Sequence, residues 1–178
     1  MYPIHNFFQI KDYLPILNGS ILAEIVILAI VFYTPFFQSG NLIKWYTNYR
    51  LSAVIADVLI LMIGLIIARA IFTYYELEWN LLKFVIVVLI IQVIHDVLFY
   101  ILFSSVPVGV NRMLDLFKKY AIEVKGGAIL GDSFMIIIAT VLSSFLAAYP
   151  TNTNIIILIV SVYLIPYLIH TQWWKYLN

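Results

Sequence analysis

Three polar residues lie together in a stretch of sequence that is otherwise apolar. Gln92, His95 and Asp96 occur within LIIQVIHDVLFYILF, and their spacing of three and four residues places them on one face of a helix. Imidazole and carboxylate groups in such a setting can bind a proton, a cation or a metal ion. Adjacent helix positions diverge by about 100°. We therefore expect His95 and Asp96 to serve different partners, not to bond to each other.

The composition indicates whether these polar groups are surrounded by water or by lipid. Of 178 residues, 64% are hydrophobic and 11% are charged, whereas soluble domains carry roughly 25% charged residues. A net charge of +1 gives no indication of nucleic-acid binding. The absence of cysteine excludes disulfides, thiolate catalysis and iron–sulfur clusters. The first apolar run lacks a preceding basic region and a cleavage site, so we expect mature sequence and not a signal peptide. The main partner of the chain is predicted to be a lipid bilayer.

Five apolar stretches are long enough to cross a membrane, which takes about 20 residues. They cover residues 18–37, 51–72, 81–103, 128–149 and 154–171. The connection from Asn111 to Lys125 has apolar residues at helical spacing, and Gly126-Gly127 follows it. This pattern predicts an amphipathic helix on the membrane surface. The predicted fold is a single all-α domain over residues 1–178, a polytopic membrane helix bundle with five transmembrane helices and one interfacial helix. No internal repeat is apparent.

The lysines and arginines predict the orientation, because short loops rich in them stay on the cytoplasmic side. One side collects Lys44, Arg50, Arg112, Lys118, Lys119, Lys125 and Lys175. The other side holds Lys11, Arg69 and Lys83. We expect an integral membrane protein with its N-terminus outside and its C-terminus in the cytoplasm.

Three aspartates are predicted to share one layer in the cytoplasmic half of the membrane. Asp57 and Asp96 lie about seven residues, and Asp132 about five, from the cytoplasmic ends of their spans, and these depths agree within one helical turn. His95 belongs to the same layer. Three carboxylates in a low dielectric cannot all stay charged without a cation. The layer, Asp57, His95, Asp96 and Asp132, is therefore a candidate proton or cation site.

Other polar residues are assigned supporting roles. Gln92 shares the polar face of the third span, Pro166 frees a backbone carbonyl in the fifth, and His170 lies at the cytoplasmic end of the fifth. On the opposite side of the membrane, Glu24 and Arg69 are predicted to form an ion pair.

Three functions are open at this stage. The layer binds or conducts a proton or cation, and conduction in so small a bundle would require a homo-oligomer. Alternatively it is a helix-packing network in a structural or assembly protein of a cellular or virion membrane. The third is a metal-dependent membrane enzyme, with metal held by His95, Asp96, Asp57 and Asp132. The enzyme is the least favoured, because no nucleophile motif or phosphate loop is present, and we assign no catalytic residue or cofactor.

Four segments together carry a resemblance to a known group of proteins. The combination of WYTNYRLSAVIADV, IQVIHDVLFY, GGAILGDSF and YLIPY resembles uncharacterised multi-span membrane proteins of large DNA viruses. The resemblance implies a viral or virion membrane as the location. It implies no chemistry for any residue.

Overall fold

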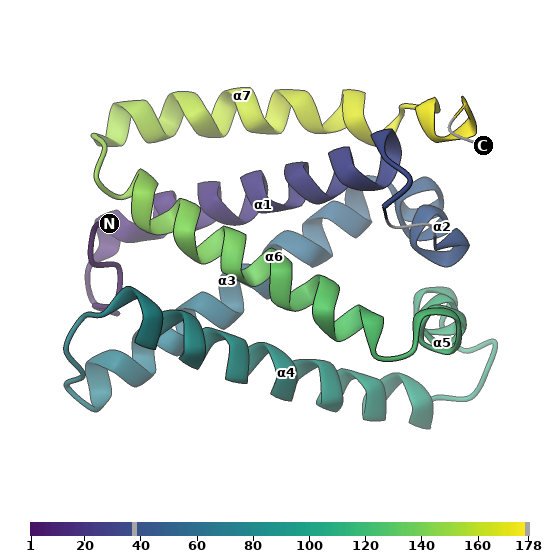
Figure 1. Ribbon diagram of the computed structural model, residues 1–178, viewed down its shortest axis with the longest axis horizontal. Coiled ribbons are helices and arrows are strands. Elements are labelled where there is room, and N and C mark those ends of the chain that lie inside the picture. Colours follow the sequence, from purple (N-terminus) through teal and green to yellow (C-terminus); the bar gives the residue numbers. More distant parts are fainter. Residues whose placement is uncertain (37–38, 177–178) are drawn as a thin grey trace.

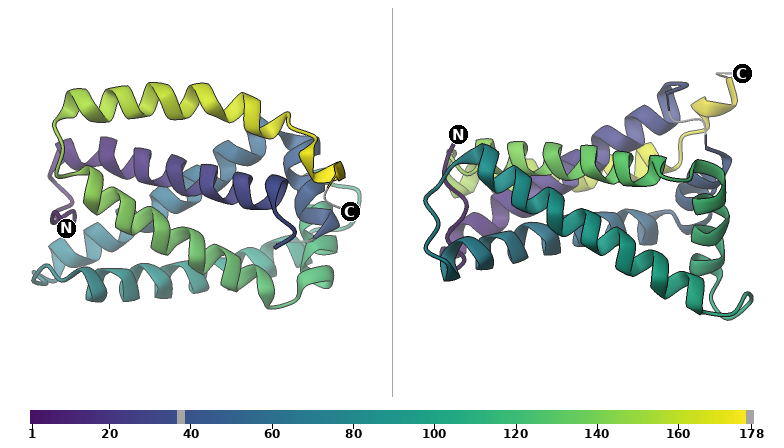
Figure 2. Two further views of the ribbon diagram at one scale, coloured as in Figure 1. Left: turned by 45° about the horizontal axis from the view of Figure 1, so that its top comes forward. Right: turned by 60° about the horizontal axis from the view of Figure 1, so that its bottom comes forward.

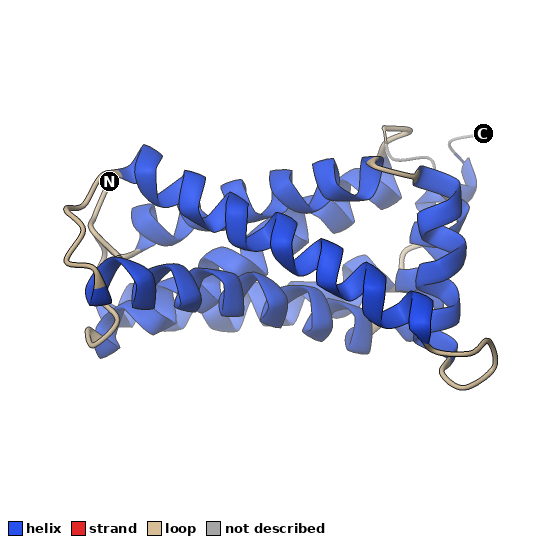
Figure 3. Cartoon of the chain, turned by 90° about the horizontal axis from the view of Figure 1, so that it is seen from below, coloured by secondary structure: helices blue, strands red, loops and turns tan. Residues whose placement is uncertain are grey.

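The computed structural model describes residues 1–36 and 39–176. All regular structure in these ranges is helical, as Figure 3 shows. In chain order the helices are α1 (Tyr13–Tyr33), α2 (Gly40–Tyr49), α3 (Leu51–Tyr74), α4 (Leu81–Ser105), α5 (Arg112–Val124), α6 (Gly127–Leu146) and α7 (Thr151–Ile169). Short 3₁₀ turns at Ile10–Asp12 and Trp173–Tyr176 precede α1 and follow α7.

Five of these helices are long and apolar enough to cross a membrane: α1, α3, α4, α6 and α7. The stretches that qualify have 19 to 25 residues, about 28 to 38 Å at 1.5 Å per residue, which matches a hydrocarbon core of about 30 Å. They run side by side (Figure 1), and the N- and C-termini lie at opposite ends. The chain is an integral membrane protein with the predicted all-α fold.

The two short helices, α2 and α5, lie at one end of the bundle. Figure 2 shows α5 running across the ends of the spanning helices. The helix α5 matches the prediction within one residue at each end and begins with Asn111 as its cap, whose side chain accepts from the backbone N–H of Met113 at 2.9 Å. Where the structure has α2, the sequence predicted only a connection between the first two spans. The cap of α2 is Ser39, which accepts from Leu42 N at 3.1 Å.

The centre of the bundle is the contact between α1 and α6. Of the most apolar stretch of α1, 61% is buried, against 11% for α4. Gly19 allows the close approach: a Cβ atom at this position would lie 2.7 Å from Ser143 N and 2.8 Å from Ala139 O. Small residues on both helices are what membrane helices use to pack backbone against backbone. The helix α7 packs beside α1 on the outside of the bundle.

The first six helices form two successive units of the same design, α1–α2–α3 and α4–α5–α6. Each unit has a spanning helix, a short helix and a second spanning helix. The short helix ends at a basic residue with positive φ, which is Arg50 (φ 47°, ψ −119°) in the first unit and Lys125 (φ 51°, ψ −129°) in the second. In both units an aspartate follows seven positions later, Asp57 and Asp132.

The contacts between the two units obey the same symmetry. The first helix of each unit packs against the last helix of the other, α1 against α6 and α4 against α3, and the two short helices pack against each other. Glu24 and Asp96 each precede the last residue of their helix, Tyr33 or Ser105, by nine positions. The expectation of no internal repeat is therefore wrong for the fold. The repeat was missed because few side chains other than these acids and basic turn residues are shared.

Candidate functional site

Four carboxylates from four spanning helices form one electrostatically linked group, which we call the carboxylate cluster: Glu24 on α1, Asp57 on α3, Asp96 on α4 and Asp132 on α6. Asp132 lies close enough to Asp57 and Asp96 to interact with both charges. Glu24 interacts with Asp57 and Asp132. Each repeat unit supplies two of the four acids, so the cluster is built where the two units meet.

Two residues of α2 hold the acids of the first unit. The indole Nε1 of Trp45 donates to Asp57 Oδ2 at 2.9 Å. The hydroxyl of Tyr46 donates to Glu24 Oε2 at 3.5 Å and also lies close to Asp57. Burial, and then the negative charges of Glu24 and Asp57, raise the pKa of Tyr46 well above its ordinary value of 10. The phenol therefore stays protonated and acts as a hydrogen-bond donor to the cluster.

The polar face predicted on the third span is present on α4. Gln92 Nε2 donates to Asp96 Oδ1 at 2.7 Å. His95 Nδ1 lies 3.2 Å from the same oxygen, so the expectation that these neighbours would not bond is wrong. Their Cβ atoms do diverge, but the ends of the two side chains turn toward each other along the surface of the helix. His95 also stacks on Phe99, with ring centroids 5.8 Å apart.

Tyr120, on the second short helix, lies within electrostatic range of Asp132. Burial, and then the charges of Asp132 and Asp57, raise the pKa of Tyr120 above its ordinary value. Counted back from the basic turn residues, Tyr120 corresponds in the second unit to Trp45 in the first, five positions before Lys125 and Arg50. Each short helix thus presents an aromatic side chain with a polar atom to the cluster.

The cluster has little positive charge to balance it. Among the described residues, no lysine or arginine nitrogen lies within 4 Å of these four carboxylates, and the one ion pair they make is that of Asp96 with His95. Glu24 is fully buried, and its Oε1 and the Oδ2 of Asp96 have no hydrogen-bond partner. Asp57 and Asp132 are partly exposed. The cluster therefore combines buried and partly exposed carboxylates without a lysine or arginine partner among the described residues.

A metal site is not formed by this arrangement. In the described part of the chain, no three His, Asp or Glu side chains come close enough together to hold a metal ion. The ligand set predicted for a metal, which was His95 with Asp57, Asp96 and Asp132, shares a region of the bundle but does not converge on one point. A metal ion needs several ligands at about 2.0 to 2.6 Å, while a proton needs one oxygen at a time.

The predicted ion pair between Glu24 and Arg69 is wrong. Arg69 is fully buried and pairs with Asp12, with 3.7 Å between Nη2 and Oδ2. The same Nη2 donates to the backbone oxygens of Asn6 and of Gln9, the latter at 2.9 Å. The prediction was wrong because it placed Glu24 too close to the outer end of its span. The helix α1 begins at Tyr13, five residues before the predicted start of the span, and Glu24 consequently lies deeper and joins the carboxylate cluster.

Two residues predicted to support the layer lie elsewhere. The interactions of the cluster involve α1 to α6, whereas Pro166 is exposed on α7, which continues through it to Ile169. His170 is exposed beyond the end of α7, with its Nδ1 3.4 Å from Arg50 Nη1. The fifth span contributes nothing to the cluster because it packs on the outer side of α1. The end predicted for the first span, Phe37, lies outside the described residues.

Sequence reasoning did not assign Glu24, Trp45, Tyr46 or Tyr120 to the site. It placed Glu24 in an ion pair on the opposite side of the membrane and gave the three aromatic residues no role at this site. One signal could have indicated Trp45 and Tyr120. The spacing from Arg50 to Asp57 equals that from Lys125 to Asp132, and aligning the two segments on it brings Trp45 opposite Tyr120. Comparison of the chain with protein-family models, with curated proteins and with solved structures finds no match.

Proposed function

We propose that this integral membrane protein binds protons at the carboxylate cluster and transfers them between the acids of its two repeat units. The observation that carries the proposal is the electrostatic interaction among carboxylates from four helices, with no lysine or arginine nitrogen within 4 Å of them in the described part of the chain. Sites at the interface of two repeats, near the middle of the membrane, are typical of proton- and ion-coupled membrane proteins.

His95 is the proposed point of proton exchange with the aqueous phase. Its side chain is 36% exposed, whereas that of Asp96 is 11% exposed. Imidazole can take up and release a proton at its ring nitrogens. A proton taken up by His95 can pass to Asp96 across 3.2 Å, and from there Asp132 is the next acid in electrostatic reach.

The distribution of basic residues supports a direction for this uptake. The end of the bundle that carries α2, α5 and the C-terminus has most of the lysines and arginines. By the positive-inside rule this end faces the cytoplasm. Protons would then enter the cluster from the cytoplasmic side, with the N-terminus outside.

Infrared difference spectroscopy of the protein in liposomes tests the proposal directly. We expect the carbonyl stretch of a protonated carboxylic acid to grow as the pH is lowered. Asp96→Asn and Asp132→Asn should each reduce this signal. Glu78→Gln, which removes a carboxylate from the exposed α3–α4 loop, should leave it unchanged. A spectrum without a pH-dependent carboxyl signal, or equal signals in all variants, would refute the proposal.

A second function, helix packing in a structural or assembly protein of a cellular or virion membrane, is favoured by the contacts of α2. The bond from Trp45 to Asp57 ties α2 to α3, and the bond from Tyr46 to Glu24 ties it to α1. Asp57→Asn separates the two functions, because the amide oxygen still accepts from Trp45 but the group no longer takes up a proton. A packing role survives this substitution, and a proton role does not.

A further inference from the structure

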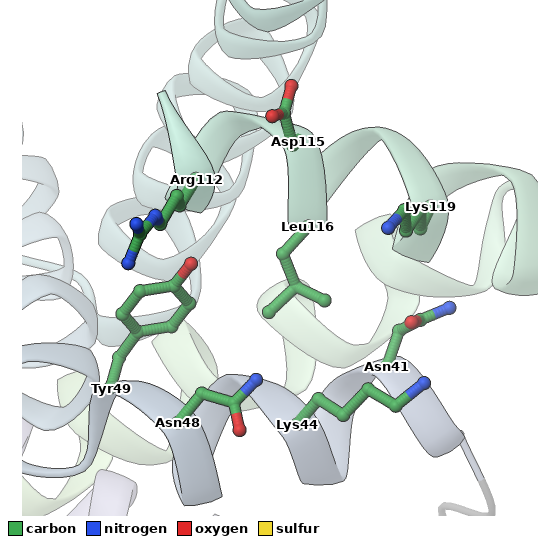
Figure 4. A pocket seen from close by; sticks show the side chains of 8 residues that line it. All are labelled: Asn41, Lys44, Asn48, Tyr49, Arg112, Asp115, Leu116 and Lys119. Carbon is green, nitrogen blue, oxygen red and sulfur yellow. The ribbon is translucent and has the colours of Figure 1, made fainter. Parts of the chain in front are cut away.

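A pocket of about 260 Å³ lies between the two short helices, at the end of the bundle that they cover. Figure 4 shows its walls, with α2 along one side and α5 along the other, running in opposite directions. The lining side chains are Asn41, Lys44, Asn48, Tyr49, Arg112, Asp115, Leu116 and Lys119. The cluster acids do not line it, so this is a separate site.

The charge inside the pocket is positive. Lys44, Arg112 and Lys119 are three cations, and none of them forms an ion pair with another described residue. The single acid of the lining, Asp115, turns away from the pocket in Figure 4. Its Oδ2 accepts from the backbone N–H of Gly109 at 2.9 Å. The carboxylate is thus held by the α4–α5 loop, and with one acid against three cations the lining has an excess of positive charge.

The repeat explains why the cations face one another. Lys44 precedes the basic turn residue Arg50 by six positions, and Lys119 precedes Lys125 by six. The two lysines are therefore equivalent in the two units, and the antiparallel contact of α2 with α5 brings them to the same pocket. Tyr49, Asn48 and Asn41 add neutral hydrogen-bonding groups from α2.

The position of the pocket indicates its ligand. Amphipathic helices such as α5 lie at the level of lipid headgroups, and basic pockets between helices on the cytoplasmic side bind anionic headgroups. The pocket volume is several times the roughly 30 Å³ that one water molecule occupies. We infer that the pocket between α2 and α5 binds the phosphate of an anionic lipid headgroup, held by Lys44, Arg112 and Lys119. This site goes beyond the proposed proton function and does not depend on it.

Thermal unfolding of the whole protein in vesicles tests the inference. The unfolding midpoint is measured in phosphatidylcholine vesicles and in vesicles of phosphatidylcholine with phosphatidylglycerol. We expect a higher midpoint with phosphatidylglycerol. Lys44→Gln and Lys119→Gln should each reduce that increase by at least half. The matched control is Lys125→Gln, which removes one charge at the same end of the bundle outside the pocket.

Two results would overturn the inference. If Lys125→Gln reduces the increase as much as Lys119→Gln does, the effect is general attraction to an anionic surface. If inorganic phosphate raises the midpoint in detergent to the same extent and with the same dependence on the two lysines, the ligand is free phosphate and not a lipid. Asp132→Asn should retain the full phosphatidylglycerol effect, which keeps this test distinct from that of the proton function.

Discussion

The two ends of the bundle differ in how their buried charged side chains are paired. Near the N-terminal end, Arg69 is fully buried and its charge is met by Asp12, by two backbone oxygens and by the face of Tyr13, whose ring centroid lies 4.3 Å from Cζ. Toward the other end, carboxylates from four helices interact electrostatically, and among the described residues the one ionisable nitrogen within 4 Å of them is that of His95. Arg69 Nε and Nη1 make no hydrogen bond, but the carboxylate beside the guanidinium makes this a structural ion pair. The four carboxylates have no lysine or arginine in that position among the described residues.

The N-terminal segment packs against the end of the bundle that contains Arg69. Phe7 N donates to Thr73 Oγ1 at 2.8 Å, and that hydroxyl donates to His5 O at 3.1 Å. Burial, and then the charge of Arg69, lower the pKa of His5. His5 therefore stays neutral near pH 7 and adds no charge beside the arginine. The segment before α1 is thus bound to α3 by hydrogen bonds.

The largest expected effect comes from breaking the closed end. Arg69→Gln leaves Asp12 buried without its cation and should lower the free energy of unfolding by about 3 to 5 kcal/mol. Denaturant unfolding in detergent measures the change. Lys83→Gln, at the same side but exposed, should change the value by about 0.5 kcal/mol or less. Equal effects of the two substitutions would show that Arg69 is not the centre of this end.

Neutralising one acid of the carboxylate cluster should lower the free energy of unfolding far less than Arg69→Gln does. Asp132→Asn removes a negative charge from an uncompensated group, so we expect the free energy of unfolding to stay within about 1 kcal/mol of the wild type. The pH-dependent carboxyl signal in the infrared difference spectrum should fall. A loss of stability as large as that of Arg69→Gln, with an unchanged carboxyl signal, would make the cluster a packing network.

A smaller gain is expected at the turn that leads into α6. Lys125 has φ 51° and ψ −129°, a region of backbone conformation that costs a residue with a Cβ about 1 to 3 kcal/mol. Lys125→Gly should therefore stabilise the fold by about 1 kcal/mol, as measured by thermal unfolding. Lys125→Ala removes the same charge but keeps the Cβ. If alanine gave the same gain, charge and not backbone conformation would be the cause.

The smallest effect concerns the contact between α5 and the start of α2. Glu123 accepts from the backbone N–H of Gly40 at 2.8 Å and of Asn41 at 3.1 Å. Slight burial acts to raise the pKa of Glu123, but these hydrogen bonds outweigh it and lower the pKa below the ordinary 4.5. Because the folded-state pKa is depressed, the contribution to stability is present above about pH 4.5 and is lost as the pH falls through the lower folded value.

Hydrogen exchange of the α2 amides measures this contribution. The wild type should show faster exchange relative to the rest of the chain at about pH 4 than at about pH 7, after correction for the intrinsic rates. Glu123→Gln should remove the difference. Persistence of the difference in that variant would assign it to another group.

Much of the fold followed from hydrophobic pattern alone. The starts of α3 and α4 are at the predicted residues, and α5 differs by one residue at each end, because long apolar runs and a capping asparagine are local signals. Gln92 and Asp96 were correctly placed on one face for the same reason. The start of α1 was missed, since Tyr13–Leu17 is apolar but Asn18 was read as the boundary. That single shift moved Glu24 from the predicted ion pair into the cluster.

The sequence by itself determined that this chain enters a membrane, how many times it crosses and which polar residues must be buried there. Those properties depend on transfer from water to lipid, which is nearly additive along the chain. Only the tertiary structure decided the partners: Arg69 with Asp12, Glu24 with Tyr46, and Lys44 opposite Lys119. Partner choice depends on how the two repeat units pack, through contacts between residues far apart in the chain. The hydrophobic pattern of a short stretch of sequence does not predict such contacts.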